Sequence, residues 1–387
     1  MNNDSNRKIR VMRIIARMNI GGPAVQVSGL MQGISSDDFE HRLYAGTCSL
    51  DEADYLEAFD TGIEVTRVPG LGRRVSLLED VKAFVNLIHH IRTFKPDVIH
   101  THTAKAGVLG RLASMTSLHS SIRVHTYHGH LLHGYFRGFK KFLVISIEKS
   151  LAQFTDQLLA VGNKVRQDLI EVGVGELSRF DLMPPGLTIG ALSDKYSSKK
   201  SLGLDVEKVN CAFIGRVTQI KRPDRFLDVV AEIKRRDVPI HFFMAGDGDL
   251  LEMCEERIRK ENLPVTVLGW RSDIEVILSA ADIVLLTSDN EGTPLCLIQA
   301  GMAKIPVVAT NVGSISEIVI NEVTGFVTPI EITSIVDALL RLVSDADLSI
   351  SLGRNAQDFT SHNFSLARLI QDHEELYKKL ISNRAKS

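Results

Sequence analysis

Short apolar runs alternate with longer amphipathic segments along almost the whole chain. Segments whose apolar residues share one helical face lie at 222–236, 250–261 and 274–280, and another starts at Pro294. Between such segments lie short runs rich in β-branched residues, at 11–16, 97–100, 122–127, 158–161, 209–214, 240–245, 265–268, 283–287, 307–309 and 325–327. Strands that alternate with helices are typical of parallel sheets. We therefore predict an α/β fold.

The alternation pauses once, at residues 181–205, where two prolines and a glycine precede a polar Ser/Lys stretch. Such a composition is typical of a domain boundary. We predict two Rossmann-like, doubly wound domains, at 1–188 and 189–364, that face one another across a cleft. Ligands of open parallel sheets bind beyond the carboxyl ends of the strands, so we expect the ligands of this protein to bind in that cleft. Residues 365–387 form an amphipathic helix that could cross back to the N-terminal domain.

Composition excludes several classes of protein. With 387 residues, 44% of them hydrophobic, the chain has enough material for two cores. A net charge of -2 gives no overall field for nucleic acid. The four cysteines form no CxxC pair, which excludes a disulfide scaffold and a zinc ribbon. With no standard export signal and no run of about 18 apolar residues, a cytoplasmic protein is expected.

Residues 246–249 carry two partial motifs, and both have a simpler explanation. Gly246-Asp247-Gly248 follows a predicted strand but lacks the third glycine of a dinucleotide fingerprint. Asp247-Gly248-Asp249 also matches a metal-binding DxD pattern by letter. A tight turn after the strand explains the same residues, because turns need Gly and Asp.

Two cations follow the strand predicted at 209–214. Arg216 and Lys221 lie on one loop, and Pro223 can occupy the first turn of the next helix. Pointing into the cleft, they could neutralise a diphosphate. A solvated basic loop is the alternative.

The segment Ser288-Asp289-Asn290-Glu291-Gly292-Thr293-Pro294 joins a strand to a helix. Pro294 suits a first helical position, so the amides of Gly292 and Thr293 would lie at a helix N-terminus, which favours phosphate oxygens. Glu291 would be repelled by phosphate unless it binds sugar hydroxyls, which are donors. The alternative is a carboxylate that only interacts with the helix dipole.

These segments carry a resemblance. The order GRVTQIKRPDRFLDVV, AGDGDL, LGW, SDNEGTPLCLIQA, PVVATNVGSISEIV and TGFV resembles the nucleotide-sugar-binding domain of family-four retaining glycosyltransferases of the GT-B fold. The resemblance implies that Arg216 and Lys221 grip the donor diphosphate, and that Glu291 holds the transferred sugar. The other donor-binding residues that it implies are Gly292, Thr293, Pro294 and Leu295, with base recognition near Trp270 and Arg271.

One position departs from the family pattern. The second acid of the family's Glu-x7-Glu motif is Gln299 here. That acid holds the ribose hydroxyls in the family. An amide can accept from one hydroxyl and donate to the other, so the loss of donor binding should be on the order of 1 kcal/mol.

The N-terminal half resembles the acceptor domain of the same family more loosely. Gly21 and Gly22 follow the first strand, where backbone amides could approach the donor phosphate, although paired glycines are common in turns. His128 resembles the family's active-site histidine and is expected to bind the transferred sugar. His102 and Lys105 are candidates for the acceptor, or are ordinary surface residues at the start of a helix.

The N-terminal half offers two further possibilities. Four histidines, His125, His128, His130 and His133, suggest a metal site, but a strand-to-loop run does not aim all four at one point. The segment from Tyr135 to Lys149 mixes aromatic and basic residues. It could rest on an anionic membrane, or pack as an ordinary helix on its domain.

Together these features predict a retaining hexosyltransferase of surface polysaccharide biosynthesis. The donor would be a UDP- or GDP-sugar and the acceptor a saccharide or lipid-linked saccharide. The resemblance implies no obligatory metal or other cofactor, and no separate enzymic base. A nucleotide-sugar epimerase of the same architecture and a non-catalytic sugar-nucleotide-binding homologue remain alternatives.

Overall fold

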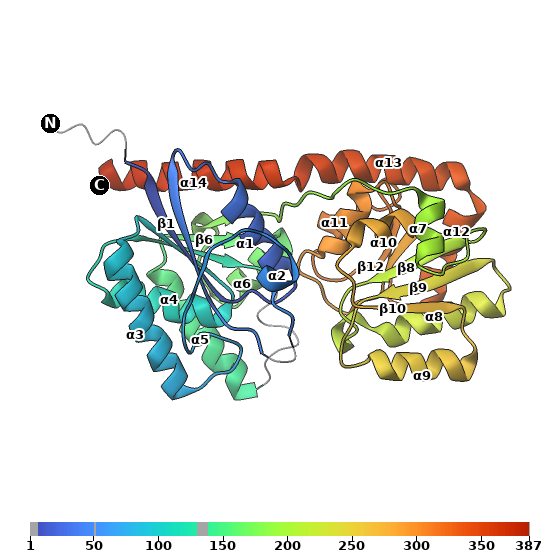
Figure 1. Cartoon of the computed structure of the whole chain (residues 1–387), viewed down its shortest axis with the longest axis horizontal. Coiled ribbons are helices and arrows are strands. Elements are labelled where there is room, and N and C mark those ends of the chain that lie inside the picture. The colour runs from blue at the N-terminus through green and yellow to red at the C-terminus, as the bar shows by residue number, and fades with distance from the viewer. Residues whose placement is uncertain (1–6, 50–51, 130–137, 387) are drawn as a thin grey trace. The chain divides into compact units, whose positions relative to one another are not determined.

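The computed structural model describes residues 7–49, 52–129 and 138–386, except for the side chains of 138–141. It divides into two compact units, residues 1–187 with 366–387, and residues 188–365. In each unit helices cover both faces of a parallel sheet (Figure 1). These sheets confirm the predicted doubly wound α/β fold.

The first unit is built on a seven-stranded sheet of order β3-β2-β1-β4-β5-β6-β7. Its strands are β1 (Ile9–Arg17), β2 (Phe39–Gly46), β3 (Val65–Arg67), β4 (Val98–His102), β5 (Ile122–Tyr127), β6 (Gln157–Ala160) and β7 (Phe180–Leu182). Its helices are α1 (Gly22–Gly33), α2 (Tyr55–Ala58), α3 (Leu77–Phe94), α4 (Ala104–Thr116), α5 (Gly138–Gln153), α6 (Asn163–Glu171) and α14 (Leu366–Lys386).

The last helix, α14, belongs to the core of the first unit. Its apolar stripe buries Leu369, Leu376 and Tyr377 against Val11 of β1 and Leu30 of α1. The Arg368 guanidinium also donates to the Pro184 carbonyl at 2.6 Å. The chain therefore completes its first unit with its last residues, and α14 covers the face of the sheet on which α1 packs (Figure 1).

The second unit is built on a six-stranded sheet of order β10-β9-β8-β11-β12-β13. Its strands are β8 (Val209–Ile214), β9 (Ile240–Ala245), β10 (Val265–Gly269), β11 (Ile283–Leu286), β12 (Val307–Thr310) and β13 (Phe326–Thr328). Its helices are α7 (Lys195–Ser201), α8 (Pro223–Arg235), α9 (Leu251–Glu261), α10 (Ile274–Ala280), α11 (Leu295–Met302), α12 (Ile332–Ser344) and α13 (Ala346–Asn363).

The strand order of the second unit creates a switch point. β8 pairs with β9 on one side and with β11 on the other. From the carboxyl end of β8 the chain continues to β9, and from the carboxyl end of β11 it continues in the opposite direction along the sheet, to β12. Ligands of doubly wound sheets bind at such points. Among the described residues, no helix is long and apolar enough to cross a membrane.

Candidate functional site

The loops after β8 and β11 meet through a buried ion pair. The Lys221 ammonium donates to Glu291 Oε1 at 2.6 Å, and the two side chains are 15% and 9% exposed. Burial lowers the pKa of Lys221, but the charge and hydrogen bond of Glu291 outweigh it and the net pKa is raised. The lysine therefore stays a cation in the site.

Backbone and hydroxyl groups hold the Glu291 carboxylate in place. Ser288 Oγ donates to Glu291 Oε1 at 2.5 Å, and the Ser314 N–H donates to the Glu291 carbonyl at 3.1 Å. Gly313 has φ +55°, and a Cβ there would lie 1.9 Å from the Glu291 carbonyl oxygen. Only glycine fits this position, so the loop after β12 supports Glu291 by close backbone approach.

Two arginines of the second unit fix the start of the β11 loop. Arg225, which is 5% exposed, donates to the Thr287 carbonyl at 2.6 Å and to Asp289 Oδ1 at 2.7 Å. Arg222 pairs with Asp289 at 3.1 Å and with Asp224 at 2.7 Å. These arginines tie α8 to the loop that carries Glu291.

The supporting roles of Arg225, Ser288 and Gly313 are not predicted from the sequence. A signal existed for Arg225, which interrupts the buried apolar face of α8. None existed for Ser288 or Gly313, because their contacts depend on how three loops converge.

The start of α11 differs slightly from the prediction. Pro294 is the residue before the helix, with φ -69° and ψ 114°, and Leu295 is the first helical residue. The first turn holds no acidic residue and no side-chain cap. Its N-terminus can therefore favour an anion. Gln299, partly exposed, lies one turn further along α11.

The remaining predicted donor-binding residues of this unit lie on neighbouring loops. Arg216 is exposed on the loop after β8, and its charge influences Lys221. Trp270, 46% exposed, follows β10. The Arg271 side chain pairs with Asp273 at 2.5 Å.

Residues 246–249 form a turn after β9. The Gly248 N–H donates to Asp247 Oδ1 at 2.7 Å, and the Val217 N–H donates to the Asp247 carbonyl at 2.9 Å. A Cβ on Gly246 would lie 1.9 Å from the Gly215 carbonyl oxygen, so the β8 and β9 loops are in close backbone contact. Within the described part of the chain, no cluster of three or more His, Cys, Asp or Glu residues is arranged for a metal ion.

The predicted residues of the first unit gather at the carboxyl ends of its own strands. Gly21 precedes α1, and Gly22 is its first residue, directly after β1. His102 ends β4, and its Nδ1 lies 2.9 Å from Nε2 of His128, just past the end of β5. Burial lowers the pKa of His128 to about 4 and that of His102 well below its usual value.

The two acceptor candidates are less accessible than a surface location implies. His102 is 1% exposed. The Lys105 ammonium is bonded to the Gly70 carbonyl at 3.0 Å, the Arg74 carbonyl at 2.5 Å and Asp80 at 2.6 Å. The two hydrogen bonds and the ion pair with Asp80 hold the ammonium inside the first unit. Its acceptor role stays a prediction.

Parts of two earlier hypotheses lie outside the described residues. They are His130 and His133 of the histidine run, and residues 135–137 of the segment from Tyr135 to Lys149. The side chains of Lys140 and Lys141 are not described either.

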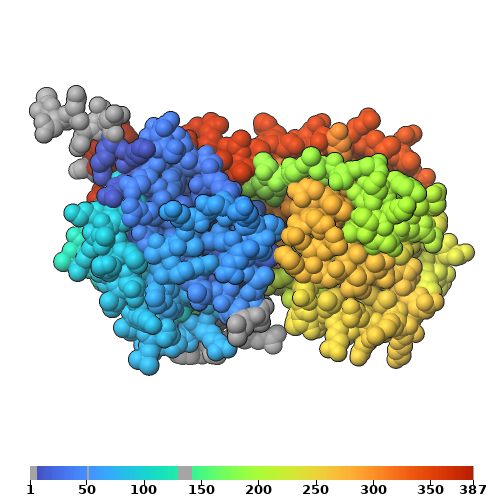
Figure 2. All heavy atoms as spheres, viewed as in Figure 1, coloured from blue at the N-terminus to red at the C-terminus, as the bar shows by residue number. Residues whose placement is uncertain are grey.

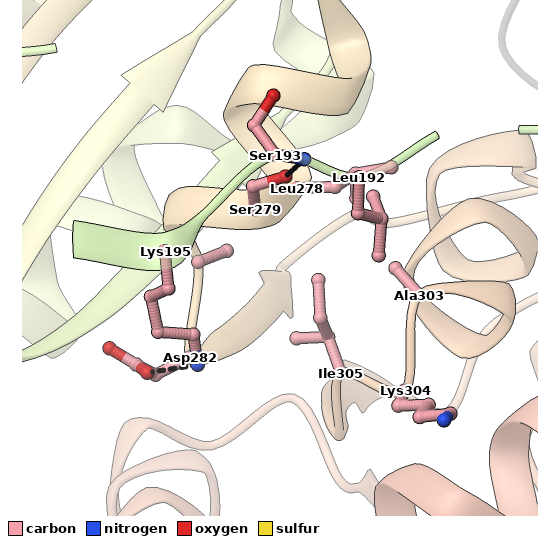
Figure 3. A pocket seen from close by; sticks show the side chains of 10 residues that line it. Leu192, Ser193, Lys195, Leu278, Ser279, Asp282, Ala303, Lys304 and Ile305 are labelled. Atoms are coloured by element: carbon pink, nitrogen blue, oxygen red, sulfur yellow. Dashed lines mark hydrogen bonds and ion pairs between the residues drawn. The ribbon is translucent and has the colours of Figure 1, made fainter. Parts of the chain in front are cut away.

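A separate pocket of about 250 Å³ lies elsewhere in the second unit (Figure 3). Its lining includes Leu192, Lys195, Asp282 and Ile305. Asp282 precedes β11 and Ile305 precedes β12, so the pocket lies at the amino ends of these strands. Glu291 follows β11, so the pocket and Glu291 lie at opposite ends of the strands.

Two family models together match most of the chain. The model "Glycosyltransferase Family 4" matches residues 20–189, and "Glycosyl transferases group 1" matches residues 194–359. A curated relative, the UDP-Gal:alpha-D-GlcNAc-diphosphoundecaprenol alpha-1,3-galactosyltransferase of Escherichia coli, is 28% identical over 341 residues, which cover 86% of this chain and 87% of that protein. The capsular polysaccharide biosynthesis glycosyltransferase CapM of Staphylococcus aureus is 20% identical over 84% of this chain and 87% of its own.

Solved structures share the same architecture. HepE of Anabaena, in complex with UDP and glucose, is 20% identical with a TM-score of 0.82, covering 96% of this chain and 99% of its own. Sucrose-phosphate synthase of Thermosynechococcus elongatus is 17% identical with a TM-score of 0.83, covering 97% of this chain and 100% of its own. At these identities the likeness shows the fold alone.

Proposed function

The chain belongs to the family-four glycosyltransferases of the GT-B fold, and we propose that it transfers a hexose-type sugar from UDP to a lipid-linked saccharide during synthesis of a surface polysaccharide. The E. coli relative is named for a UDP-galactose donor and a diphosphoundecaprenol acceptor, and CapM for capsular polysaccharide. These names support the donor and acceptor classes.

The Lys221–Glu291 pair carries this proposal. A buried cation and a fixed carboxylate stand together at a helix N-terminus, at the carboxyl ends of β8 and β11. Such a site can bind a diphosphate through the cation and the helix amides, and sugar hydroxyls through the carboxylate.

The chemistry follows from where charge develops. As the glycosidic bond breaks, negative charge grows on the leaving diphosphate. Arg216, Lys221 and the amides of Gly292 to Leu295 stabilise that charge. Glu291 accepts hydrogen bonds from the transferred sugar, and Gln299 binds the ribose. The base lies near Trp270 and Arg271.

The proposal includes retention of the anomeric configuration without a metal ion. The leaving phosphate takes the proton of the acceptor hydroxyl on the face from which it departs, so no enzymic base is required. The positive charges of Lys221 and Arg216 neutralise the leaving diphosphate, as a divalent cation does in other transferases. In the first unit, His128 binds the transferred sugar, and the amides at Gly21 and Gly22 approach the donor phosphate.

The first unit also has the surface for a membrane-bound acceptor. Exposed apolar residues lie just before α3, at Val75, and in its first half, at Leu77, Leu78, Val81 and Val85, of which Leu77 and Leu78 are 80% and 82% exposed. In Figure 2 the atoms of α3 lie at the surface of the first unit. Arg74 and Lys82 are exposed beside these residues. Apolar and basic residues on one helix face suit an anionic bilayer.

The neighbouring helix α5 extends this surface. Phe142 and Leu143 in its first half are 67% and 49% exposed. Helix α4 packs against both α3 and α5, so the three helices form one layer. The proposed membrane contact therefore includes α3 as well as the segment from Tyr135 to Lys149.

The two alternatives are less well supported. The family models and the relatives are glycosyltransferases, which argues against an epimerase. The E. coli relative and CapM are both named as transferases, which argues against a non-catalytic homologue.

A thermal-shift screen against UDP-, GDP- and ADP-sugars tests the donor class. A ligand that binds only the folded state raises its Tm. We expect UDP-sugars to raise the Tm of the wild type, and to have a smaller effect on Lys221→Ala. A larger shift with GDP- or ADP-sugars would contradict the donor assignment.

A further inference from the structure

The donor has to bind to a cation and an anion that are already in contact. The Lys221 ammonium and the Glu291 carboxylate lie 2.6 Å apart, and the two side chains are 15% and 9% exposed. In the proposed function the diphosphate binds Lys221 and the transferred sugar binds Glu291. A ligand therefore meets both charges at once, and the carboxylate disfavours any phosphate that comes close to it.

The carboxylate is fixed in this position. Glu291 Oε1, the atom that accepts from Lys221, also accepts from Ser288 Oγ at 2.5 Å. Ser288 is completely buried. If the carboxylate turned away from a ligand, the buried Ser288 hydroxyl would lose its acceptor, which is costly. The negative charge of Glu291 therefore stays beside the Lys221 ammonium when a ligand enters.

The loops that carry the two charges are also bonded to one another. Thr287 Oγ1 donates to the Arg222 carbonyl at 3.0 Å, and the Asp289 N–H donates to the Ile220 carbonyl at 2.9 Å. The accepting carbonyls lie on both sides of Lys221, and the donors lie on the loop that leads to the carboxylate. The two loops therefore stay together without the ion pair, and a ligand cannot separate the charges by moving either backbone.

A phosphate on Lys221 has to lie close to Glu291. An ammonium has three N–H donors, so Lys221 can bind a phosphate oxygen while it still donates to Glu291. Each of the two acceptor oxygens then lies about 2.8 Å from the nitrogen, so the oxygens are at most about 6 Å apart. At that distance two negative charges in a largely buried site repel one another more strongly than they would in water.

A sugar on the diphosphate changes this contact. Its hydroxyls donate hydrogen bonds, which a carboxylate accepts. In UDP without a sugar, the oxygen that carried the sugar belongs to a terminal phosphate. When the glycosidic bond breaks, that oxygen keeps the bonding electron pair and takes the proton of the acceptor hydroxyl. The second pKa of a terminal phosphate is about 6, so the proton is lost at pH 7.5 and UDP carries one more negative charge than the UDP-sugar.

We propose that the fixed carboxylate of Glu291 makes the donor site select nucleotides that carry a sugar over the bare nucleoside diphosphate, and so promotes release of UDP after transfer. This inference rests on the proposed function, which assigns the diphosphate to Lys221 and the sugar to Glu291. Lys221 cannot make the distinction alone, because its charge attracts both ligands. Glu291 makes it, because the sugar supplies donors to the carboxylate and the terminal phosphate supplies a like charge.

The test measures the Kd of UDP and of UDP-galactose by calorimetry at pH 7.5, with full-length protein and no acceptor. Glu291→Gln removes the charge at nearly the same size, and Glu291→Asp keeps the charge. Glu322→Gln is the matched control, because it makes the same change in an ion pair with Arg341 in which Glu322 is 56% exposed. Circular dichroism and Tm show whether each variant is folded.

We expect Glu291→Gln to bind UDP about tenfold more tightly than the wild type and to bind UDP-galactose no more tightly. Glu291→Asp should stay closer to the wild type than Glu291→Gln does, and Glu322→Gln should equal the wild type. UDP binding that is unchanged or weaker in Glu291→Gln, or equally tightened in Glu322→Gln, would overturn the inference.

A second variant covers a failure of Glu291→Gln to fold. Ser288→Ala keeps both charges but frees the carboxylate from its fixed position, and should tighten UDP binding by about threefold. An unchanged Kd for UDP in this variant would then overturn the inference. The Kd values also separate the inference from the proposed function. If both nucleotides bind but no sugar is transferred to a lipid-linked saccharide, the proposed reaction fails, and the Kd values still decide the selectivity of Glu291.

Discussion

At the residue scale, the site combines one familiar pair with one unusual position. Glu291 is fixed by Lys221, Ser288 and the backbone of the β12 loop, whereas Gln299 sits partly exposed on α11 where the family pattern has an acid. If these residues divide the donor between them, substitutions at the two positions should affect different kinetic constants.

Three variants test this division of the donor. Gln299→Glu should keep or modestly tighten donor binding, because a carboxylate accepts from both ribose hydroxyls, and Gln299→Ala should raise KM for the donor. Glu291→Ala should mainly lower kcat, because contacts with the transferred sugar matter most as it gains positive character. Steady-state kinetics separates the effects. Loss of activity in Gln299→Glu, or a silent Glu291→Ala, would show that the family roles do not transfer to these residues.

At the element scale, the exposed half of α3 should bind an anionic bilayer. Changing Leu77 and Leu78 together to Ser removes two side chains that are at least 80% exposed. Cosedimentation with phosphatidylglycerol vesicles should fall by at least about tenfold, since each buried leucine contributes about 1.5–3 kcal/mol.

Leu118→Ser is the matched control for the α3 variant. Leu118 is 92% exposed but lies after α4, just before the start of β5, at the opposite edge of the sheet. It should leave vesicle binding unchanged. Equal binding by the α3 variant and the wild type would remove α3 from the membrane contact.

The same scale shows what the sequence can predict. The strands at 209–214, 240–245 and 122–127 and the helix at 274–280 were predicted to the residue, because short β-branched runs and amphipathic periods are local signals. The helix predicted from Pro294 begins one residue later, as the ψ of 114° at Pro294 excludes it from the helix. Such end effects depend on the loop that precedes the helix.

The contacts within the candidate site were harder to predict. Lys221 and Glu291 could be singled out from their loops, but their direct pairing could not, because 70 residues separate them. The buried histidine pair was also missed. His102 follows a strand and looks like a surface residue in the sequence, whereas β5 and His100 enclose it in the fold.

At the scale of the whole molecule, buried histidines make the protein sensitive to acid. Burial, together with the charge of Arg13, lowers the pKa of His41 and that of His373 to about 3, and burial lowers the pKa of His128 to about 4. In the unfolded chain these groups titrate near their ordinary pKa of about 6.5. Below that pH the unfolded chain binds more protons than the folded protein.

Stability should therefore be complete above about pH 6.5 and fall as the pH decreases toward 4. Three such histidines should lower the free energy of unfolding by about 3–4 kcal/mol between pH 7.5 and 5.5, measured by urea titration. His41→Leu removes one of these groups and should reduce the fall in the free energy of unfolding over this interval by about 1.4 kcal/mol. A free energy of unfolding that is equal at pH 7.5 and 5.5 would contradict this reading of the core.

The most direct test of the account is sugar transfer from radiolabelled UDP-hexoses to a diphosphoundecaprenol-linked saccharide, measured in EDTA for the wild type, Arg216→Ala and Lys221→Ala. Arg216 is exposed, whereas Lys221→Ala removes the ion-pair partner of Glu291, so circular dichroism and Tm first establish that each variant is folded. We predict wild-type transfer in EDTA and rates lower by about 10²–10³ in each variant, the usual effect of removing one donor that stabilises transition-state charge. Near-normal rates in both variants, or activity that returns only with Mg²⁺ or Mn²⁺, would contradict a metal-free donor site built on Arg216 and Lys221.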